Sequence, residues 1–163
     1  MVRIVFTLWM FASVAVAQVD KGPFEAAFKK EAVSFQAAVD DAVNSVVPGP
    51  AAGVTEHAKA TFLEGYGVVV SLEASLEPGH TPFSSPKTLA ELRTIVVQRR
   101  KDVQSKLEAL MKDRIAKLSA VGDMESLTIA IHLFSSSPDL QLPKQIVLTV
   151  KKQDPATVIV REY

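Results

Sequence analysis

The fold class is decided by the stretch Val68-Val69-Val70-Ser71-Leu72-Glu73-Ala74-Ser75-Leu76. Its even-numbered positions are all apolar and its odd-numbered positions become polar after Val69, which is the period-two pattern of a β-strand. Both faces are apolar near Val69, as expected of a central strand. Gly65 and Gly67 allow a tight turn or a bulge after a preceding strand over residues 57–63. The sequence therefore predicts a β-hairpin here.

A long helix is predicted after this hairpin. Thr88-x-x-Glu91 forms a capping box, in which the two side chains satisfy backbone N–H groups reciprocally, and Gly122 is a suitable stop. The apolar stripe between them consists of Leu89, Leu92, Val96, Val103, Leu107, Leu110 and Leu118. An unbroken helix over residues 86–120 would be about 50 Å long. Part of it would overhang the sheet, where it would meet the first helix or a partner.

An amphipathic helix is predicted before the hairpin. Gly22-Pro23 opens it and Pro48-Gly49-Pro50 ends it in a hinge. Its apolar stripe consists of Phe24, Phe28, Phe35, Val39, Val43 and Val46. At this helical spacing the residues are typical of a core-facing surface.

Two or three strands follow the long helix. Residues 127–133 and 146–151 alternate between apolar and polar positions, and residues 157–160 form a last short strand. We therefore expect an α+β fold of order α-β-β-α-β-β(-β), with an antiparallel sheet and the long helix packed on one face. Residues 18–53 form the first helix and its hinge, and residues 54–163 form the α+β domain, which makes one globular unit with that helix.

The first 17 residues predict a secretory signal peptide. Arg3 supplies the positive charge, an apolar run follows, and the run closes on Ala15-Val16-Ala17 before Gln18. The run is too short to cross a membrane, which takes roughly 20 apolar residues, and no second such run follows. We expect cleavage between Ala17 and Gln18 and export to the periplasm or the extracellular space, with no transmembrane segment left.

The composition excludes several kinds of site. The chain has no cysteine, which rules out disulfides, thiol chemistry, Cys-ligated zinc and iron–sulfur clusters. Its histidines are His57, His80 and His132, and none belongs to a spacing typical of metal ligands. We expect no metal site and no cofactor. A formal net charge of +0, together with the export signal, argues against nucleic acid as a partner.

Basic residues gather on the long helix. Residues 87–120 hold nine basic and four acidic residues, and acid–lysine pairs at i, i+4 account for three of the basic ones. The candidate binding residues among the others are Arg93, Arg99, Arg100 and Lys101. Two interpretations stay open: a solvated face that contacts the first helix, or a binding site for an envelope protein or an anionic envelope component.

Two function classes follow from these observations. The favoured one is an exported, soluble binding or scaffolding module of the cell envelope, because no catalytic motif is present; Tyr66, on its glycine turn, is then either packed or presented to a partner. The alternative is an exported hydrolase with a site near the 64–73 hairpin, built from Glu64, Tyr66, Glu73 and His132. The overhanging helix also allows a homodimer.

Overall fold

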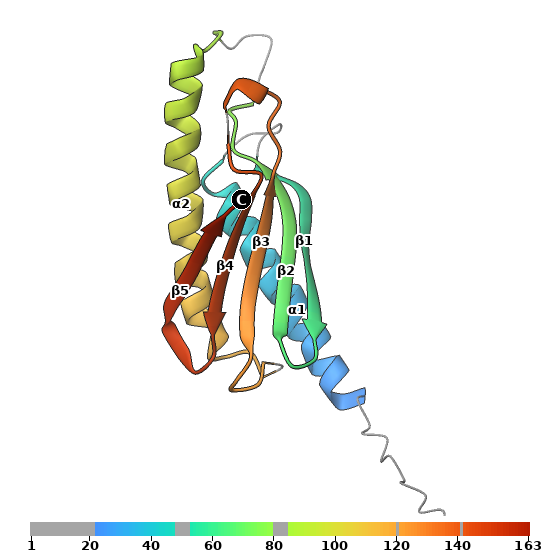
Figure 1. Cartoon of the computed structure of the whole chain (residues 1–163). Helices are drawn as coiled ribbons and strands as arrows, with labels where there is room; N and C mark the ends of the chain where they lie inside the picture. Colours follow the sequence, from blue (N-terminus) through green and yellow to red (C-terminus); the bar gives the residue numbers. More distant parts are fainter. Residues whose placement is uncertain (1–21, 48–52, 80–84, 120, 141) are drawn as a thin grey trace, which may run out of the picture.

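The computed structural model describes residues 22–47, 53–79, 85–119, 121–140 and 142–163 (Figure 1). The predicted signal peptide, its cleavage point, the Pro48-Gly49-Pro50 hinge and His80 lie outside these residues. The elements are, in chain order, α1 (Gly22–Asn44), β1 (Gly53–Leu63), β2 (Gly67–Ser75), α2 (Leu89–Ile115), β3 (Ser126–Leu133), the short 3₁₀ helix η1 (Pro138–Leu140), β4 (Gln145–Lys151) and β5 (Asp154–Glu162). This order confirms the predicted α+β fold.

The strands of the described residues form one five-stranded sheet in the order β1-β2-β3-β4-β5. The pairs β1–β2, β3–β4 and β4–β5 are antiparallel. The pair β2–β3 is parallel, although the prediction gave an antiparallel sheet. The difference arises because α2 carries the chain back along the sheet between these two strands, so β3 starts at the end where β2 started.

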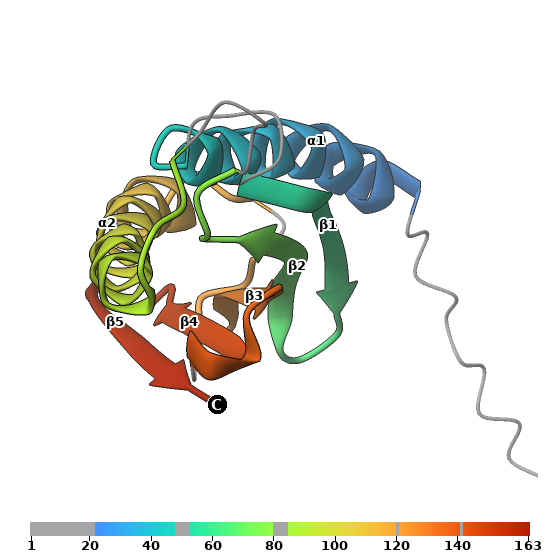
Figure 2. The same ribbon diagram turned by 90° about the horizontal axis from the view of Figure 1, so that it is seen from above.

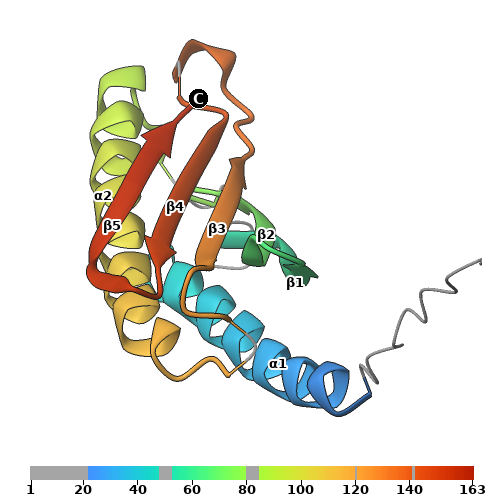
Figure 3. The ribbon, with the colours of Figure 1, turned by 60° about the horizontal axis from the view of Figure 1, so that its bottom comes forward.

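Both helices cover the same face of the sheet. In Figure 1 α1 passes behind β2 and β3, in Figure 3 α2 lies behind β4 and β5, and Figure 2 shows the strands curving around the space that the helices close. The residues of the sheet that point into this space are almost fully buried. They include Val68, Val70, Leu72, Ala74, Leu127, Ile129, Ile131, Ile146, Leu148 and Val150. Since alternate residues point to opposite faces, the residues between them form the opposite face. None of the described helices covers it, and we call it the uncovered face.

Helix α1 packs on the edge strand β1 and on α2. Its stripe Phe35, Val39 and Val43 is at most 2% exposed, and Phe28 makes an edge-on contact with Phe62 of β1, with ring centroids 6.0 Å apart. Asp40 adds a polar anchor, because Oδ1 accepts a hydrogen bond from the backbone N–H of Ala58 at 2.9 Å and Oδ2 lies 2.7 Å from Nδ1 of His57.

Helix α2 begins at Leu89, directly after the predicted capping residue Thr88 and three residues later than the predicted range of 86–120, and it ends earlier than predicted. The capping box of Thr88 and Glu91 is present. The helix ends at Ile115, before the predicted stop at Gly122, and its 27 residues span about 40 Å. The chain beyond it is held by other elements: Glu31 of α1 accepts hydrogen bonds from Ser119, and the ammonium of Lys152 donates to the carbonyls of Leu118 and Val121.

The N-terminal part of α2 contacts the segment between β3 and β4. Leu140 of η1 is buried, η1 packs on α2, and the guanidinium of Arg93 donates to the carbonyl of Asp139 at 2.9 Å. The overhang expected from the sequence is therefore covered partly by this segment of the same chain.

Candidate functional site

The uncovered face of the sheet carries one polar side chain from each of β1 to β4, and an aromatic one from the residue directly after β5, all at the same level along the strands. These residues are Glu56, Glu73, His132, Gln145 and Tyr163, and we call them the polar row. Register pairs Glu56 with Glu73, Glu73 with His132, and His132 with Gln145. Two backbone hydrogen bonds then pair Gln145 with Tyr163. Residues paired in this way share a face, so the row crosses the whole sheet and is about 19 Å long.

A second row runs beside the polar row, at an offset of three residues on β1 and of two residues at each of the other four positions. It consists of Lys59, Ser71, Ala130, Val147 and Arg161, which register places opposite one another. Its centre is apolar, because Ala130 and Val147 lie between the polar ends. Both of these side chains are half-buried, and Ser71 and Arg161 are exposed. The two rows therefore offer charged, polar and apolar groups side by side.

A β-bulge in β1 sets the geometry at one end of the rows. Glu56 pairs with Glu73 and Lys59 pairs with Ser71, so three steps along β1 match two steps along β2. Residues i and i+3 of a regular strand point to opposite faces, and the extra residue of the bulge brings Glu56 and Lys59 to the same face. There the ammonium of Lys59 donates a hydrogen bond to Oε1 of Glu56.

This ion pair fixes the charge of Glu56. The hydrogen bond from Lys59 and the attraction of its positive charge lower the pKa of the Glu56 carboxyl below its usual value. Glu56 is therefore a carboxylate at neutral pH and a poor proton donor. It can accept hydrogen bonds from a ligand.

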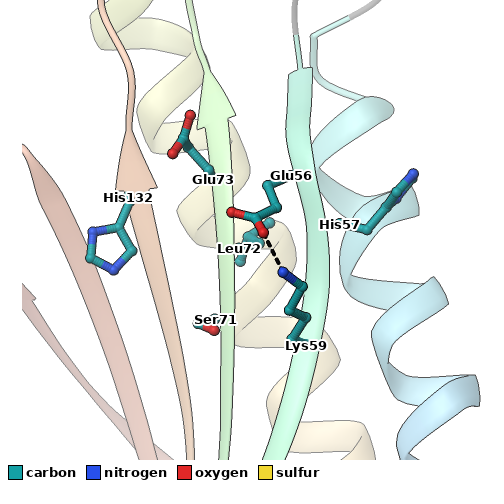
Figure 4. Close-up of a pocket in the computed structure, with 7 residues that line it drawn as sticks. All are labelled: Glu56, His57, Lys59, Ser71, Leu72, Glu73 and His132. Atoms are coloured by element: carbon teal, nitrogen blue, oxygen red, sulfur yellow. Dashed lines mark hydrogen bonds and ion pairs between the residues drawn. The ribbon is translucent and has the colours of Figure 1, made fainter.

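A hollow of about 220 Å³ lies over the β1, β2 and β3 ends of the rows (Figure 4). Glu56, Lys59, Ser71, Glu73 and His132 line it, together with Leu72 and His57. The ring of His57 points away from the others in Figure 4, toward Asp40. Oε1 of Glu73 accepts a hydrogen bond from the hydroxyl of Thr55 at 3.2 Å, which fixes one oxygen of this carboxylate.

Tyr66 lies at the opposite end of the same face. Its hydroxyl oxygen is 3.0 Å from that of Thr128, which in turn is 3.1 Å from that of Thr149. The side chain of Tyr66 is thus anchored on Thr128 and Thr149, which are register partners on β3 and β4. The residue is still 45% exposed. The hydroxyl of Tyr66 is therefore packed on the sheet, and presentation of this residue to a partner stays a prediction.

The four residues of the hydrolase hypothesis divide into two pairs. Glu73 and His132 are register partners on β2 and β3, as expected if the polar faces of their strands pair. Glu64 and Tyr66 belong to the turn at the other end of the hairpin. Gly67 and Glu73 are six residues apart on one strand, which is about 20 Å. Of the four residues in the hydrolase hypothesis, Glu73 and His132 are therefore the two that could share one catalytic site.

The basic residues predicted to bind a partner make contacts within the chain. Arg93 donates to Asp139 as described above. The guanidinium of Arg99 donates to the carbonyl of Leu76 at 3.0 Å, and Nη1 of Arg100 lies 3.2 Å from Oε2 of Glu162 on β5. Burial lowers the pKa of Arg99, which nonetheless stays charged at neutral pH. Lys101 is exposed. Their role toward an anionic partner stays a prediction.

The serine cluster after β3 holds a buried carboxylate. Glu77 is 5% exposed, and it accepts hydrogen bonds from the hydroxyls of Ser135 and Ser136, both at 2.5 Å, and from the backbone N–H of Ser137 at 3.4 Å. Burial opposes ionisation of this carboxyl, but the hydrogen bonds outweigh it and lower its pKa. The serines therefore anchor a loop, and Glu77 is a structural residue that sequence reasoning missed.

Sequence reasoning also missed most of the polar row. It singled out Glu73 and His132, but not Glu56, Gln145 or Tyr163. The strand alternation was a usable signal at Glu73 and His132, which have apolar neighbours on both sides. It gives no such signal at Glu56, which lies between Thr55 and His57, or at Gln145, which follows Lys144. The alternation does not show which residues of neighbouring strands lie opposite one another. That register depends on the bulge in β1 and on the parallel pairing of β2 with β3.

The described residues show no group of three or more His, Asp or Glu side chains arranged to hold a metal ion. Within the same ranges, no helix combines the length and apolar character needed to span a membrane. No family model matches the chain, and no curated protein and no solved structure matches it either.

Proposed function

We propose that this protein is an exported binding module of the cell envelope, and that its binding face is the uncovered face of the sheet. The observation that supports this is the polar row: β1, β2, β3 and β4 each present a polar side chain there, Tyr163 after β5 adds an aromatic one, and two helices cover the other face. Exposed polar groups on a rigid sheet are pre-organised for recognition, because little conformational entropy is lost on binding.

Photo-crosslinking in cells tests the binding face. Ala130 at the centre of the uncovered face, and the exposed Ala37 on α1 as the matched control, are each replaced by a photo-crosslinking amino acid in the whole chain. We expect the residue at position 130 to capture an envelope component and the residue at position 37 to capture less or none. Equal capture at the two positions, capture at position 37 alone, or capture at neither position would overturn the proposed binding face.

Export rests on the signal-peptide pattern and has its own test. We expect the protein recovered from cells that express the whole chain to begin at Gln18 and to be found in the periplasm or the medium. Its intact mass and N-terminal sequence measure the cleavage point directly. Recovery of the uncleaved chain inside the cell would contradict the proposal of export.

A second candidate function, an exported hydrolase, is favoured by one observation. Glu73 and His132 lie side by side on a polar hollow, and a carboxylate beside an imidazole is a common general acid–base arrangement. Hydrolysis of envelope polymers by the purified protein, abolished in both Glu73→Gln and His132→Ala, would support it. Activity that survives both substitutions would remove this pair from any mechanism.

An anionic partner on α2 and a homodimer are the remaining proposals for this chain. Lys101→Glu tests the first without disturbing Arg99 or Arg100, whose side chains make intramolecular contacts. Unchanged recovery of envelope components with this variant would count against the basic residues. Sedimentation of the purified protein over a range of concentrations measures the second, and a monomer at every concentration would contradict it.

A further inference from the structure

The two rows on the uncovered face carry equal numbers of acidic and basic side chains. The polar row and the second row together contain the acidic residues Glu56 and Glu73 and the basic residues Lys59 and Arg161. A face of one sign attracts ligands of the opposite sign, whereas a balanced face has no such preference. The composition of the two rows therefore favours an uncharged, polar ligand over a polyanion or a polycation.

The polar groups suit a ligand with many hydroxyl and amide groups. Carboxylates accept hydrogen bonds, ammonium and guanidinium groups donate them, and the amide of Gln145 does both. Nε2 of His132 lies 3.4 Å from the amide nitrogen of Gln145, which places two planar polar groups next to each other. Hydroxyl groups on neighbouring carbons of a sugar ring present pairs of donors and acceptors that such planar groups can bind.

Exposed aromatic rings lie at the same end of the sheet. Tyr163 at the end of the polar row is 62% exposed, and Phe134, just beyond β3, is 54% exposed. Phe134 shares a second hollow, of about 550 Å³, with His132 and Leu142. Flat aromatic surfaces beside polar groups pack well against amphipathic ligands, and the C–H face of a sugar ring is such a surface.

The apolar centre of the second row adds a further requirement. Ala130 and Val147 are half-buried and lie between Ser71 and Arg161. A small apolar patch surrounded by hydrogen-bonding groups accommodates a methyl group whose neighbours are polar. The acetamido group of an N-acetylated sugar has this combination, with a methyl group next to an N–H and a carbonyl.

The edges of the sheet disfavour an extended peptide as the ligand. A peptide that adds a strand needs a regular edge with free N–H and carbonyl groups. Strand β1 is bulged and carries Glu56 and Lys59, and β5 contains Pro155, which has no N–H to donate. Charges, bulges and proline are the devices by which edge strands avoid such pairing.

From these observations we propose that the polar row and the second row bind an uncharged glycan chain that carries N-acetyl groups. The proposal rests on the proposed binding function and names the ligand class of the same face. The chain would lie across the strands, because the polar row extends in that direction from Glu56 to Tyr163.

Titration with defined oligosaccharides tests the proposal. Protein purified from cells expressing the whole chain is titrated with the hexamer of β-1,4-linked N-acetylglucosamine, and the backbone amide signals are followed by NMR. We expect shifts at the two rows and not on α2. The glucose hexamer, which lacks the acetamido groups, should bind about tenfold more weakly, the effect of about one hydrogen bond.

Two variants and one control assign the binding to the rows. His132→Ala and Tyr163→Ala should each weaken binding of the hexamer about fivefold or more. Gln98→Ala is the control, because Gln98 is exposed on α2, which covers the other face of the sheet. Its affinity should be unchanged. Equal losses in all three variants would overturn the proposal.

The outcomes separate this inference from the proposed function. If the N-acetylated hexamer causes no shifts at millimolar concentration while position 130 still captures an envelope component, the glycan inference is wrong and the binding face stands. If the hexamer shifts only residues outside the two rows, the inference is also wrong. If neither experiment finds a ligand on this face, both proposals fail.

Discussion

The hydroxyl of Ser136 donates a hydrogen bond of 2.5 Å to Oε2 of Glu77, and thereby joins the loop after β3 to the end of β2. Ser135 and the backbone N–H of Ser137 satisfy Oε1 of the same carboxylate. A buried carboxylate is costly unless its oxygens are hydrogen-bonded. The three consecutive serines meet that requirement, and the loop owes its position to Glu77.

Replacing this carboxylate should destabilise the protein. In Glu77→Ala the two hydroxyls and the N–H lose their common acceptor, and we expect the free energy of unfolding to fall by about 1–3 kcal/mol. Chemical denaturation at neutral pH measures it. Ser85→Ala, an exposed serine before α2, is the control and should change stability by less than about 0.5 kcal/mol. Equal values for the two variants would contradict the anchoring role.

The same carboxylate should make stability depend on pH. Its pKa is lowered in the folded state by the hydrogen bonds from the serines, so the unfolded chain binds its proton at higher pH than the folded protein does. The stabilisation is complete above the unfolded pKa and is lost as the pH falls through the folded pKa. Denaturation at neutral pH and at about pH 3 should therefore show a smaller acid loss for Glu77→Gln than for the wild type. If the stability of Glu77→Gln fell with pH as much as that of the wild type, the pH dependence would not come from Glu77.

Asp40 should be a main attachment of α1 to the sheet. It accepts a hydrogen bond from Ala58 at the bulge and lies beside His57, whereas its neighbour Asp41 is exposed. We expect Asp40→Ala to cost about 1–3 kcal/mol and Asp41→Ala less than about 0.5 kcal/mol. Hydrogen exchange should show faster exchange at the Ala58 amide in the Asp40 variant alone. Unchanged protection there would rule out the attachment.

The elements of this fold could be predicted from local patterns, because each signal lies within the element it describes. The alternation from Val68 to Leu76, and the capping box at Thr88 and Glu91, both recur in the structure. The parallel pairing of β2 with β3 could not be predicted this way, since it depends on the path of α2 across the sheet. The hydrolase hypothesis named both Glu73 and His132, but the local patterns do not show that their strands are neighbours in the sheet.

The missed features all depend on contacts between distant segments. Glu77 lies just before a proline, where its sequence neighbours give no sign of the serines that bind it. The segment that follows the early end of α2 is hydrogen-bonded to Glu31 and Lys152, which lie far from it in the sequence. The bulge that brings Glu56 and Lys59 to the same face contains no glycine, so the sequence gives no local signal for it. Local periodicity carries no information on such contacts.

Arg99 should stabilise the fold more than Lys101, although both belong to the predicted basic patch. The Arg99 guanidinium is partly buried and donates to the carbonyl of Leu76 at the end of β2, whereas Lys101 is exposed. We expect Arg99→Ala to lower the free energy of unfolding by about 1–2 kcal/mol, and Lys101→Ala to change it by less than about 0.5 kcal/mol. Thermal denaturation measures the stability of both variants. Similar melting temperatures would mean that Arg99 contributes no more to stability than an exposed lysine does.

Gly67 at the start of β2 should tolerate no side chain. Its φ of +113° is unfavourable for other residues, and a β-carbon there would lie 2.1 Å from the carbonyl oxygen of Ser126 on β3. Gly65 in the same turn also has a positive φ, +77°, but a β-carbon there meets nothing within 4 Å. Conformational strain is therefore common to both positions, and the clash is confined to Gly67.

The two alanine variants separate these effects. Gly65→Ala should cost about 1–2 kcal/mol, the price of the left-handed conformation alone. Gly67→Ala should cost about 4 kcal/mol or more, because the backbone of β2 or β3 has to move. Urea denaturation measures both, and NMR should show displaced amide signals along β2 and β3 only in Gly67→Ala. Comparable losses would mean that β3 does not approach Gly67 as closely as the structure indicates.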